Sequence, residues 1–257
     1  LSVNRMATLR QVIDLLQHTL QPWLYQDYCP NGLQVAGRDE VRRVMTGVTA
    51  CQPLLEEAVR WGADAVLVHH GYFWKGESPC VTGIRKERLK TLLFNDLSLL
   101  AYYLPLDGHP EVGNNAMFAA RLGLPVSGPL FPNSPGQVGN YADLPEAVDV
   151  AWLSERLQQV LERPPLHVPG GPEKIRRIGF CTGGAQGFIE QAVQMGCDAY
   201  ISGEISEPTT HIAREAGIHY FAAGHHATER YGIQALGELL GRELGVEHRF
   251  LDIPNPA

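Results

Sequence analysis

Histidines and acidic residues recur in this chain at places where predicted strands end. Two adjacent histidines, His69 and His70, follow the apolar run "AVLV". Further along, "LPLDGH" offers Asp107, and "GHHATER" offers His225 and Glu229. Imidazole and carboxylate groups without thiolates are typical ligands of Zn, Fe, Mn or Ni. The residue types therefore predict a metal centre built from histidines and carboxylates.

The spacing of these residues indicates how they could share a centre. His225 and Glu229 are four residues apart, so on a helical turn they lie on one face, and Glu229 could bridge two ions. Neighbouring side chains on a strand point to opposite faces. His69 and His70 could therefore each bind a different ion only if the pair lies past the strand, on a loop. The alternative is that these are ordinary hydrogen-bonded histidines, with Asp107 a turn former.

An internal repeat indicates which elements position these side chains. Residues 42–70 and 176–204 align at a constant offset of 134 positions, with nine identities in 29. In each copy a β-branched strand precedes an amphipathic helix that stops at Gly62 or Gly196, and a buried strand follows. The expected helices cover residues 8–20, 52–61, 84–94, 150–162, 186–195 and 208–216.

Strands that alternate with helices imply βαβ crossovers. We expect an α/β protein of two similar lobes related by internal duplication and a pseudo-twofold axis, with mixed or parallel sheets flanked by helices. The lobes cover residues 1–126 and 127–257, and the Pro- and Gly-rich stretch 123–140 is typical of a linker. Sites in open α/β sheets form at the carboxyl ends of strands. In the second lobe these ends also carry Glu204 and His226, so histidines and acids occupy matched strand ends in both copies.

Composition argues against several classes of protein. Five scattered cysteines without a C-x-x-C pair argue against a disulfide framework or a thiolate zinc site, and they fit a reducing cytoplasm. No apolar run approaches the ~20 residues of a membrane span, and the first residues carry no apolar signal core. A formal net charge of −7 disfavours a nucleic-acid partner, although a local basic patch could hide within it.

Four motifs carry a resemblance to a known family. They are "NGLQV" (31–35), "DAVLVHHGYFWKG" (64–76), "LPLDGHPEVGNN" (104–115) and "AAGHHATER" (222–230). They resemble the motifs of the NIF-three-like family, also called the GTP cyclohydrolase I type 2 homologue family, in its short form without a middle insertion. The resemblance implies an interlocked two-lobe protomer, a ring-shaped homohexamer and a dinuclear metal site that faces the central cavity.

The same resemblance implies a ligand set for two divalent ions, whose identity it leaves open among Zn, Fe, Mn and Ni. The implied ligands are His69, His70, Asp107, His225 and Glu229. His226 falls at a position that varies in the family. Tyr103 is a departure, because a histidine often stands there, four residues before the aspartate, and we expect an altered outer shell.

The first function hypothesis is a metal-dependent hydrolase. The family name implies opening of the GTP imidazole ring, with hydroxide attacking C8 and Glu204 or His226 shuttling protons. Gly183 and Gly184 in "CTGGAQGF" could cradle phosphate on exposed amides, and Lys75 could steer an anionic substrate. A plain tight turn and a solvated lysine are the alternatives. Phosphoester cleavage at the same metals remains open.

The second hypothesis is a non-catalytic ring that handles metal or binds a partner, with nucleic acid allowed but not favoured. Phe73 and Trp74 beside the histidines could be partner or base-stacking contacts, or core aromatics. Salt dependence separates the two hypotheses, because nucleic-acid binding falls steeply with added salt and small-molecule hydrolysis does not.

Overall fold

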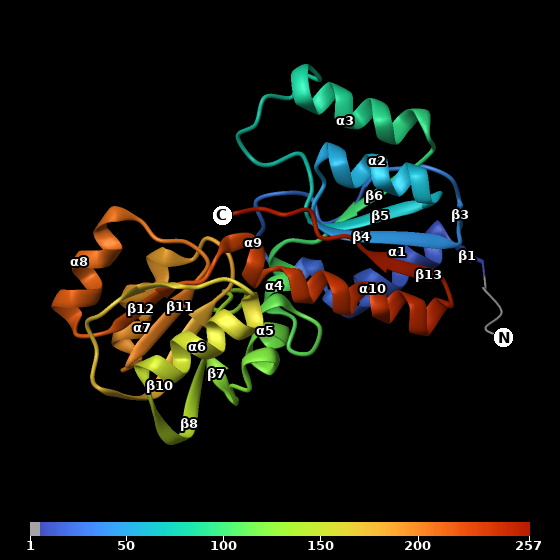
Figure 1. Ribbon diagram of the computed structural model, residues 1–257. Coiled ribbons are helices and arrows are strands. Elements are labelled where there is room, and N and C mark those ends of the chain that lie inside the picture. Colours follow the sequence, from blue (N-terminus) through green and yellow to red (C-terminus); the bar gives the residue numbers. More distant parts are fainter. Residues whose placement is uncertain (1–5) are drawn as a thin grey trace. The chain divides into compact units, whose positions relative to one another are not determined.

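The computed structural model describes residues 6–257, which form two compact units, each with its own sheet (Figure 1). The first unit ends its main stretch at Leu106 and also includes Ile233–Pro254, and the second comprises Asp107–Gly232 and Asn255–Ala257. This division differs from the expected lobes of 1–126 and 127–257. The chain returns to the first unit near its end because β13 (Glu247–Phe250) pairs in parallel with β4 (Arg43–Thr49).

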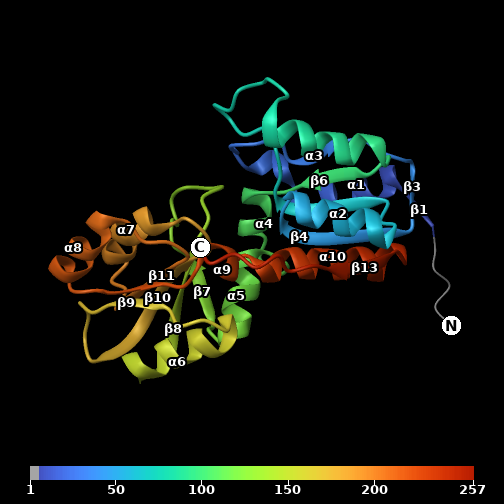
Figure 2. The same ribbon diagram turned by 45° about the horizontal axis from the view of Figure 1, so that its top comes forward.

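The first unit is a five-stranded sheet with helices on both faces. Its other elements are β1 (Ala7–Thr8), α1 (Leu9–Leu20), the 3-10 helix η1 (Pro22–Leu24), β2 (Gly32–Val35), β3 (Glu40–Val41), α2 (Gln52–Trp61), β5 (Ala65–His70), α3 (Gly83–Phe94), β6 (Ser98–Ala101) and most of α10 (Arg230–Leu244). The strand order is β13-β4-β5-β6-β2, and only β2 is antiparallel to its neighbour. Helices α2 and α3 cover one face, and α1 and α10 lie along the other (Figure 2).

The second unit is a six-stranded sheet of order β7-β8-β10-β11-β12-β9. Its elements are α5 (Asn114–Leu122), β7 (Val126–Pro129), β8 (Asn140–Asp149), α6 (Val150–Leu161), β9 (Leu166–Val168), β10 (Lys174–Cys181), η2 (Gln186–Phe188), α7 (Ile189–Gln194), β11 (Ala199–Ser202), α8 (Glu207–Ala216), β12 (His219–Ala222) and α9 (His225–Thr228). Strands β10, β11 and β12 are parallel, and the three outer strands are antiparallel to their neighbours. α5 and α6 bury apolar side chains against one face of this sheet.

The stretch 123–140 is not a linker between the units. Its residues Val126–Pro129 form β7, which pairs with β8 inside the second unit. Proline and glycine are tolerated there because β7 is an edge strand. The parallel and mixed sheets flanked by helices confirm the predicted α/β class. Across residues 6–257, no helix combines the length and the apolar character needed to cross a membrane.

A matched contact occurs at the amino end of the first parallel strand in each unit. The Asp64 carboxylate accepts the main-chain N–H groups of Arg42 and Arg43 at 2.8 and 3.0 Å. In the second unit the Asp198 carboxylate accepts the N–H groups of the corresponding residue pair, 176 and 177, at 2.7 and 2.9 Å. These positions correspond in the sequence repeat, so the contacts support the inference of an internal duplication.

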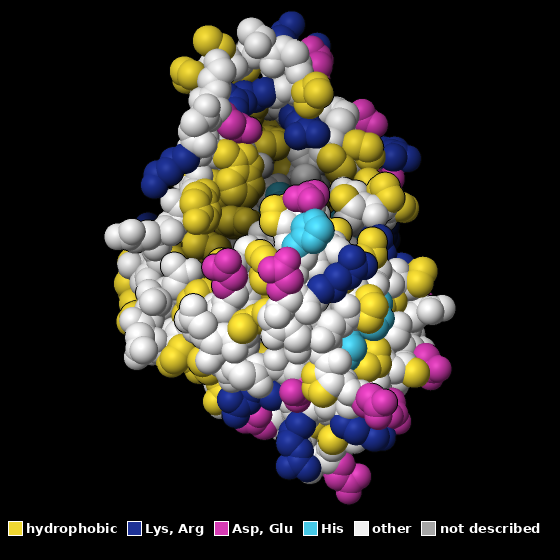
Figure 3. All heavy atoms as spheres, turned by 90° about the vertical axis from the view of Figure 1, so that its left-hand side faces the viewer, with side chains coloured by type: hydrophobic (Ala, Val, Ile, Leu, Met, Phe, Trp, Pro, Cys, Tyr) yellow, Lys and Arg dark blue, Asp and Glu magenta, His cyan; other side chains and the backbone are white. Residues whose placement is uncertain are grey.

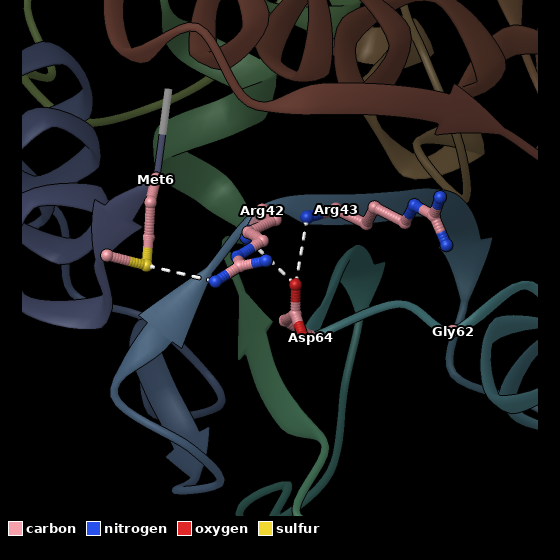
Figure 4. Close-up of a pocket in the computed structure, with 5 residues that line it drawn as sticks. All are labelled: Met6, Arg42, Arg43, Gly62 and Asp64. Atoms are coloured by element: carbon pink, nitrogen blue, oxygen red, sulfur yellow. Dashed lines mark hydrogen bonds between the residues drawn. The ribbon is translucent and has the colours of Figure 1, made fainter. Parts of the chain in front are cut away.

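Figure 4 shows the first of these contacts, at the edge of a hollow of about 530 Å³ that also includes Met6 and Gly62. The hollow lies at the amino end of β4, whereas sites of α/β sheets form at carboxyl ends. Asp64 is already satisfied by the N–H groups of Arg42 and Arg43. We therefore interpret the hollow as structural and look for the site at the opposite end of the strands.

Candidate metal centre

The histidine pair of the first unit lies at the carboxyl end of a strand. Both residues belong to β5, so the expected loop beyond the strand is wrong. His69 is fully buried and His70 is partly buried. Their ring centroids are nevertheless only 4.6 Å apart, with ring planes inclined by 39°. The two imidazoles are thus close neighbours although their residues are adjacent on a strand.

Hydrogen bonds set the orientation of both rings. His69 Nδ1 lies 2.9 Å from the carbonyl oxygen of Tyr102. Since a carbonyl only accepts, Nδ1 carries the proton and the lone pair of neutral His69 is on Nε2. His70 Nδ1 lies 3.0 Å from the hydroxyl of Thr49, its partner across the sheet. A neutral imidazole whose Nδ1 is held in this way is a typical metal ligand through Nε2.

In the second unit, His225 lies between two carboxylates. Its Nδ1 is 2.6 Å from Oε1 of Glu204, and its Nε2 is 3.2 Å from Oε2 of Glu229. Glu229 ends the short helix α9 and its side chain is only 2% exposed. Burial disfavours the charged imidazole, but the hydrogen bonds and charges of Glu229 and Glu204 outweigh burial and raise the pKa of His225 to about 9. The two carboxylates therefore favour a positive charge on the imidazole between them.

Asp107 does not end a strand as expected, because it lies in a short helix, α4 (Leu104–Gly108). It is buried, and its Oδ1 accepts the side-chain amide of Asn114 at 2.9 Å. Asn115 donates to the Asp107 carbonyl oxygen at 3.1 Å, and its own side-chain oxygen accepts the Thr182 N–H at 3.0 Å. Sequence reasoning missed both asparagines, although the adjacent pair "NN" closes the motif that contains Asp107.

The glycine-rich loop after β10 passes next to these carboxylates. Gly183 has a φ of +73°, and a Cβ there would collide with Oε1 of Glu229 and lie 3.2 Å from His225 Nε2. The Gly183 N–H donates to the Thr228 hydroxyl at 3.0 Å, and the N–H of residue 185 donates to a serine hydroxyl at 3.1 Å. These two amides are therefore used within the protein. The role of Gly183 visible here is to leave room for Glu229.

The remaining predicted residues occupy different surroundings. A Cβ at Gly184 would lie 3.5 Å from the Glu204 carboxylate. The side chain of His226 is buried, and its main-chain N–H donates to the Ala257 carbonyl oxygen at 3.2 Å. Lys75 is exposed, on the loop that follows the histidine pair.

The donor types in the two units fit a metal centre. The first unit offers the imidazoles of His69 and His70, and the second offers the Glu229 carboxylate, and each of these groups is of a type that ligates metal ions. Tyr103, at the position where the resembling family often has histidine, places its ring centroid 5.0 Å from that of His69 and 5.8 Å from that of His70. It contributes an aromatic ring beside the histidines rather than another nitrogen donor.

Comparisons with known proteins identify relatives along almost the whole chain. Residues 7–256 match the family model described as Duf34/NIF3 (NGG1p interacting factor 3). A Pseudomonas aeruginosa protein named "GTP cyclohydrolase 1 type 2 homolog" is 60% identical, over 90% of this chain and 92% of the relative. A protein of the same name from Escherichia coli K12 is 52% identical, over 95% and 97% of the two chains.

Solved structures agree with the fold. The structure of protein ybgI, described as of unknown function, has a TM-score of 0.93 and 50% identity, covering 97% of this chain and all (100%) of that one. The structure of TTHA1606 from Thermus thermophilus has a TM-score of 0.88 and 31% identity, with the same coverage of 97% and 100%.

Proposed function

Because this chain belongs to the Duf34/NIF3 family, we propose that it is a hydrolase that uses two divalent metal ions. The observation that supports this best is the set of histidine and carboxylate donors, each held by a hydrogen bond to a neighbour. The proposed ligands are His69, His70, Asp107, His225 and Glu229. Such donors suit Zn, Fe, Mn or Ni.

The partners of these ligands have the arrangement expected around a metal. The Tyr102 carbonyl orients His69, the Glu204 carboxylate orients His225, and the Asn114 amide holds Asp107. Outer partners of this kind fix the ring tautomer and orientation and raise the basicity of the ligand.

Two divalent ions bound here would supply a nucleophile at neutral pH and stabilise developing negative charge on the substrate. We propose Glu204 as the acid–base residue. Its Oε1 accepts the hydrogen bond from His225 Nδ1, and its side chain is 42% exposed, so Oε2 can take a proton from the attacking water and return it to the leaving group. His226 is buried and is the weaker candidate for this role.

The proposed substrates are anionic small molecules. Close relatives are named "GTP cyclohydrolase 1 type 2 homolog", so hydrolytic opening of the guanine imidazole ring is the first reaction to test. Phosphoester cleavage is the second. In this proposal the exposed Lys75 attracts the anion, and the loop at Gly183 and Gly184, next to the Glu229 and Glu204 carboxylates, borders the substrate.

The test combines metal content with turnover. We expect two ions per chain in metal-replete protein, and metal-dependent hydrolysis of GTP or a phosphoester that Glu229→Gln abolishes. Glu190→Gln, the same change at an exposed site on α7, is the matched control and should leave both unchanged. Less than one ion per chain contradicts the dinuclear site. Full metal binding without any turnover that depends on Glu229 favours a non-catalytic metal-binding or partner-binding protein.

We further propose that copies of the chain assemble into a homohexameric ring in the cytoplasm. Helix α3 exposes large apolar side chains that an interface would cover, with Ile84, Leu93 and Phe94 exposed by 71%, 60% and 80%. Exposed hydrophobic side chains also appear as yellow patches among the charged ones in Figure 3. Light scattering after gel filtration should give six times the chain mass. A monomeric mass would contradict the ring.

A further inference from the structure

An aromatic cluster surrounds the histidine pair within the first unit. Tyr103 is its centre, because its ring centroid lies 4.9 Å from that of Trp74 and 6.3 Å from that of Tyr28, with both pairs near edge-to-face. The same ring contacts His69 and His70, at centroid distances of 5.0 and 5.8 Å. We call Tyr28, Trp74 and Tyr103 the aromatic platform.

The aromatic platform is open to solvent, unlike a packing cluster. Tyr28 is 59% exposed, and Trp74 and Tyr103 are each partly exposed. Phe73, next to the platform in sequence, is 38% exposed. Exposed aromatic surface beside convergent polar groups is typical of a ligand-binding site, since burial would otherwise have been the more stable arrangement.

A hydrogen-bond network fixes Tyr103 in place. The Asn31 side-chain oxygen accepts the Tyr103 N–H at 2.8 Å, and the Asp27 carboxylate accepts the Leu104 N–H at 3.0 Å. Asn31 also donates to Asp27 at 2.7 Å, which joins the two contacts. The segment that carries Tyr28 is therefore tied to the segment that carries Tyr103.

The loop that carries Trp74 is fixed as well. Its indole N–H donates to the Gly71 carbonyl oxygen at 3.2 Å, and the N–H of Lys75 donates to the Tyr28 carbonyl oxygen at 2.7 Å. Phe73 has a φ of +65°, a left-handed conformation that bulky residues rarely adopt and that clusters at ligand-binding sites. A platform arranged before the ligand arrives loses less conformational entropy on binding.

We propose that the aromatic platform stacks on a planar aromatic heterocycle of the substrate, of the nucleobase class, beside the histidine pair. This inference rests on the proposed function, since it takes His69 and His70 as metal ligands. An aromatic face accepts any base, so stacking selects for a flat ring rather than for one hydrogen-bond pattern. The exposed Lys75 on the same loop suits a ligand that also carries a phosphate.

The test compares two probes of similar charge by calorimetry on the metal-loaded protein. Guanosine 5′-monophosphate contains the ring and ribose 5-phosphate lacks it, so we expect the first to bind at least tenfold more tightly. Replacing Trp74 by leucine should weaken binding of the nucleotide by about 5- to 100-fold, because stacking on one aromatic side chain is lost. Trp74→Phe keeps a ring and should restore most of the affinity.

Trp23→Leu is the matched control, because Trp23 is an exposed tryptophan on η1 outside the aromatic platform, and its loss should leave the affinity unchanged. Circular dichroism and the thermal midpoint show whether each variant folds. Equal affinity for the two probes, or wild-type nucleotide affinity in a folded Trp74→Leu variant, overturns the inference.

The failure of this inference can be told apart from failure of the proposed function. If metal content and phosphoester hydrolysis are normal while the two probes bind equally, the stacking proposal fails and the hydrolase stands. If the protein holds no metal but binds the nucleotide through Trp74, the metal-dependent hydrolase fails and the stacking site stands.

Discussion

Replacing Gly183 by alanine tests whether the glycine loop serves to accommodate the Glu229 carboxylate. Gly183 has a φ of +73°, and an added Cβ would collide with Oε1 of Glu229. The same Cβ would lie 3.0 Å from the Glu229 carboxyl carbon and 3.2 Å from His225 Nε2. Glu229 is buried, so its carboxylate can yield only by leaving its place beside His225.

Two effects of the substitution can be separated. An alanine at positive φ costs about 1 kcal/mol of folding free energy, which lowers the thermal midpoint of a chain of this size by roughly 2–4 °C. Losing an outer partner of a metal ligand costs about 10- to 100-fold in metal affinity, or roughly 1.4–2.8 kcal/mol, so displacing a proposed ligand itself should cost at least that much. The loss of metal affinity is specific to this position.

Gly196→Ala is the matched control. Gly196 has a φ of +69°, and apart from its own backbone and its two chain neighbours no atom of the described residues lies within 4 Å of a Cβ built on it. Thermal unfolding should show the cost of the positive φ in both variants, with a larger loss in Gly183→Ala because the buried Glu229 carboxylate is displaced, and titration with Zn²⁺ or Mn²⁺ should show weaker metal binding only in Gly183→Ala. If Gly183→Ala binds metal with wild-type affinity, the proposed role of this loop is refuted.

Three further predictions concern single contacts. Glu204→Gln should weaken metal binding by about 10-fold or more in the same titration, because His225 Nδ1 loses its charged partner. Unchanged metal affinity would exclude a role of Glu204 in orienting His225. Asp64→Ala and Asp198→Ala should each lower the free energy of unfolding by about 2 kcal/mol in urea, because each substitution leaves two main-chain N–H groups without their acceptor. Strongly unequal effects would argue against equivalent roles for the two aspartates. Burial lowers the pKa of His248 below its ordinary 6.5, although Glu238 acts to raise it. The unfolded state then binds more protons, so stability should fall as the pH drops below about 6.5, and His248→Gln should flatten that slope in unfolding experiments from pH 5 to 8.

Local signals in the sequence predicted six of the helical segments, whereas α5 and α10 were not among the expected helices. α2 (Gln52–Trp61) has the predicted bounds because its apolar spacing is amphipathic and Gly62, at φ +73°, ends it. The division into units was not predictable in this way. It depends on the parallel pairing of β13 with β4, two segments about 200 residues apart whose pairing leaves no local pattern. Similarly, the prolines near β7 were interpreted as a linker, because linkers and edge strands both tolerate proline and the sequence alone does not distinguish them.

The chemistry of the site was more visible in the sequence than its contacts. Residue types identified His225 and Glu204 separately, but their hydrogen bond was missed. The structure explains it, since β11 and β12 are parallel neighbours with Ser202 opposite Ala222, and Glu204 and His225 follow these two strand ends. Asp107 was misplaced because "LPLD" continues an apolar run, whereas β6 stops at Ala101 before that segment begins.

The aligned segments 42–70 and 176–204 differ at the carboxyl ends of their strands, where α/β sheets carry chemistry. At the amino ends, Asp64 and Asp198 make the same pair of main-chain contacts. At the carboxyl ends, the position that holds His70 in the first copy holds Glu204 in the second, at the offset of 134. In our proposal the first is a metal ligand, and the second orients a ligand, His225. The contacts at the amino ends of the two sheets are therefore alike, whereas the carboxyl ends differ: the first unit has an imidazole at this position, and the second has a carboxylate that orients His225 of its own unit.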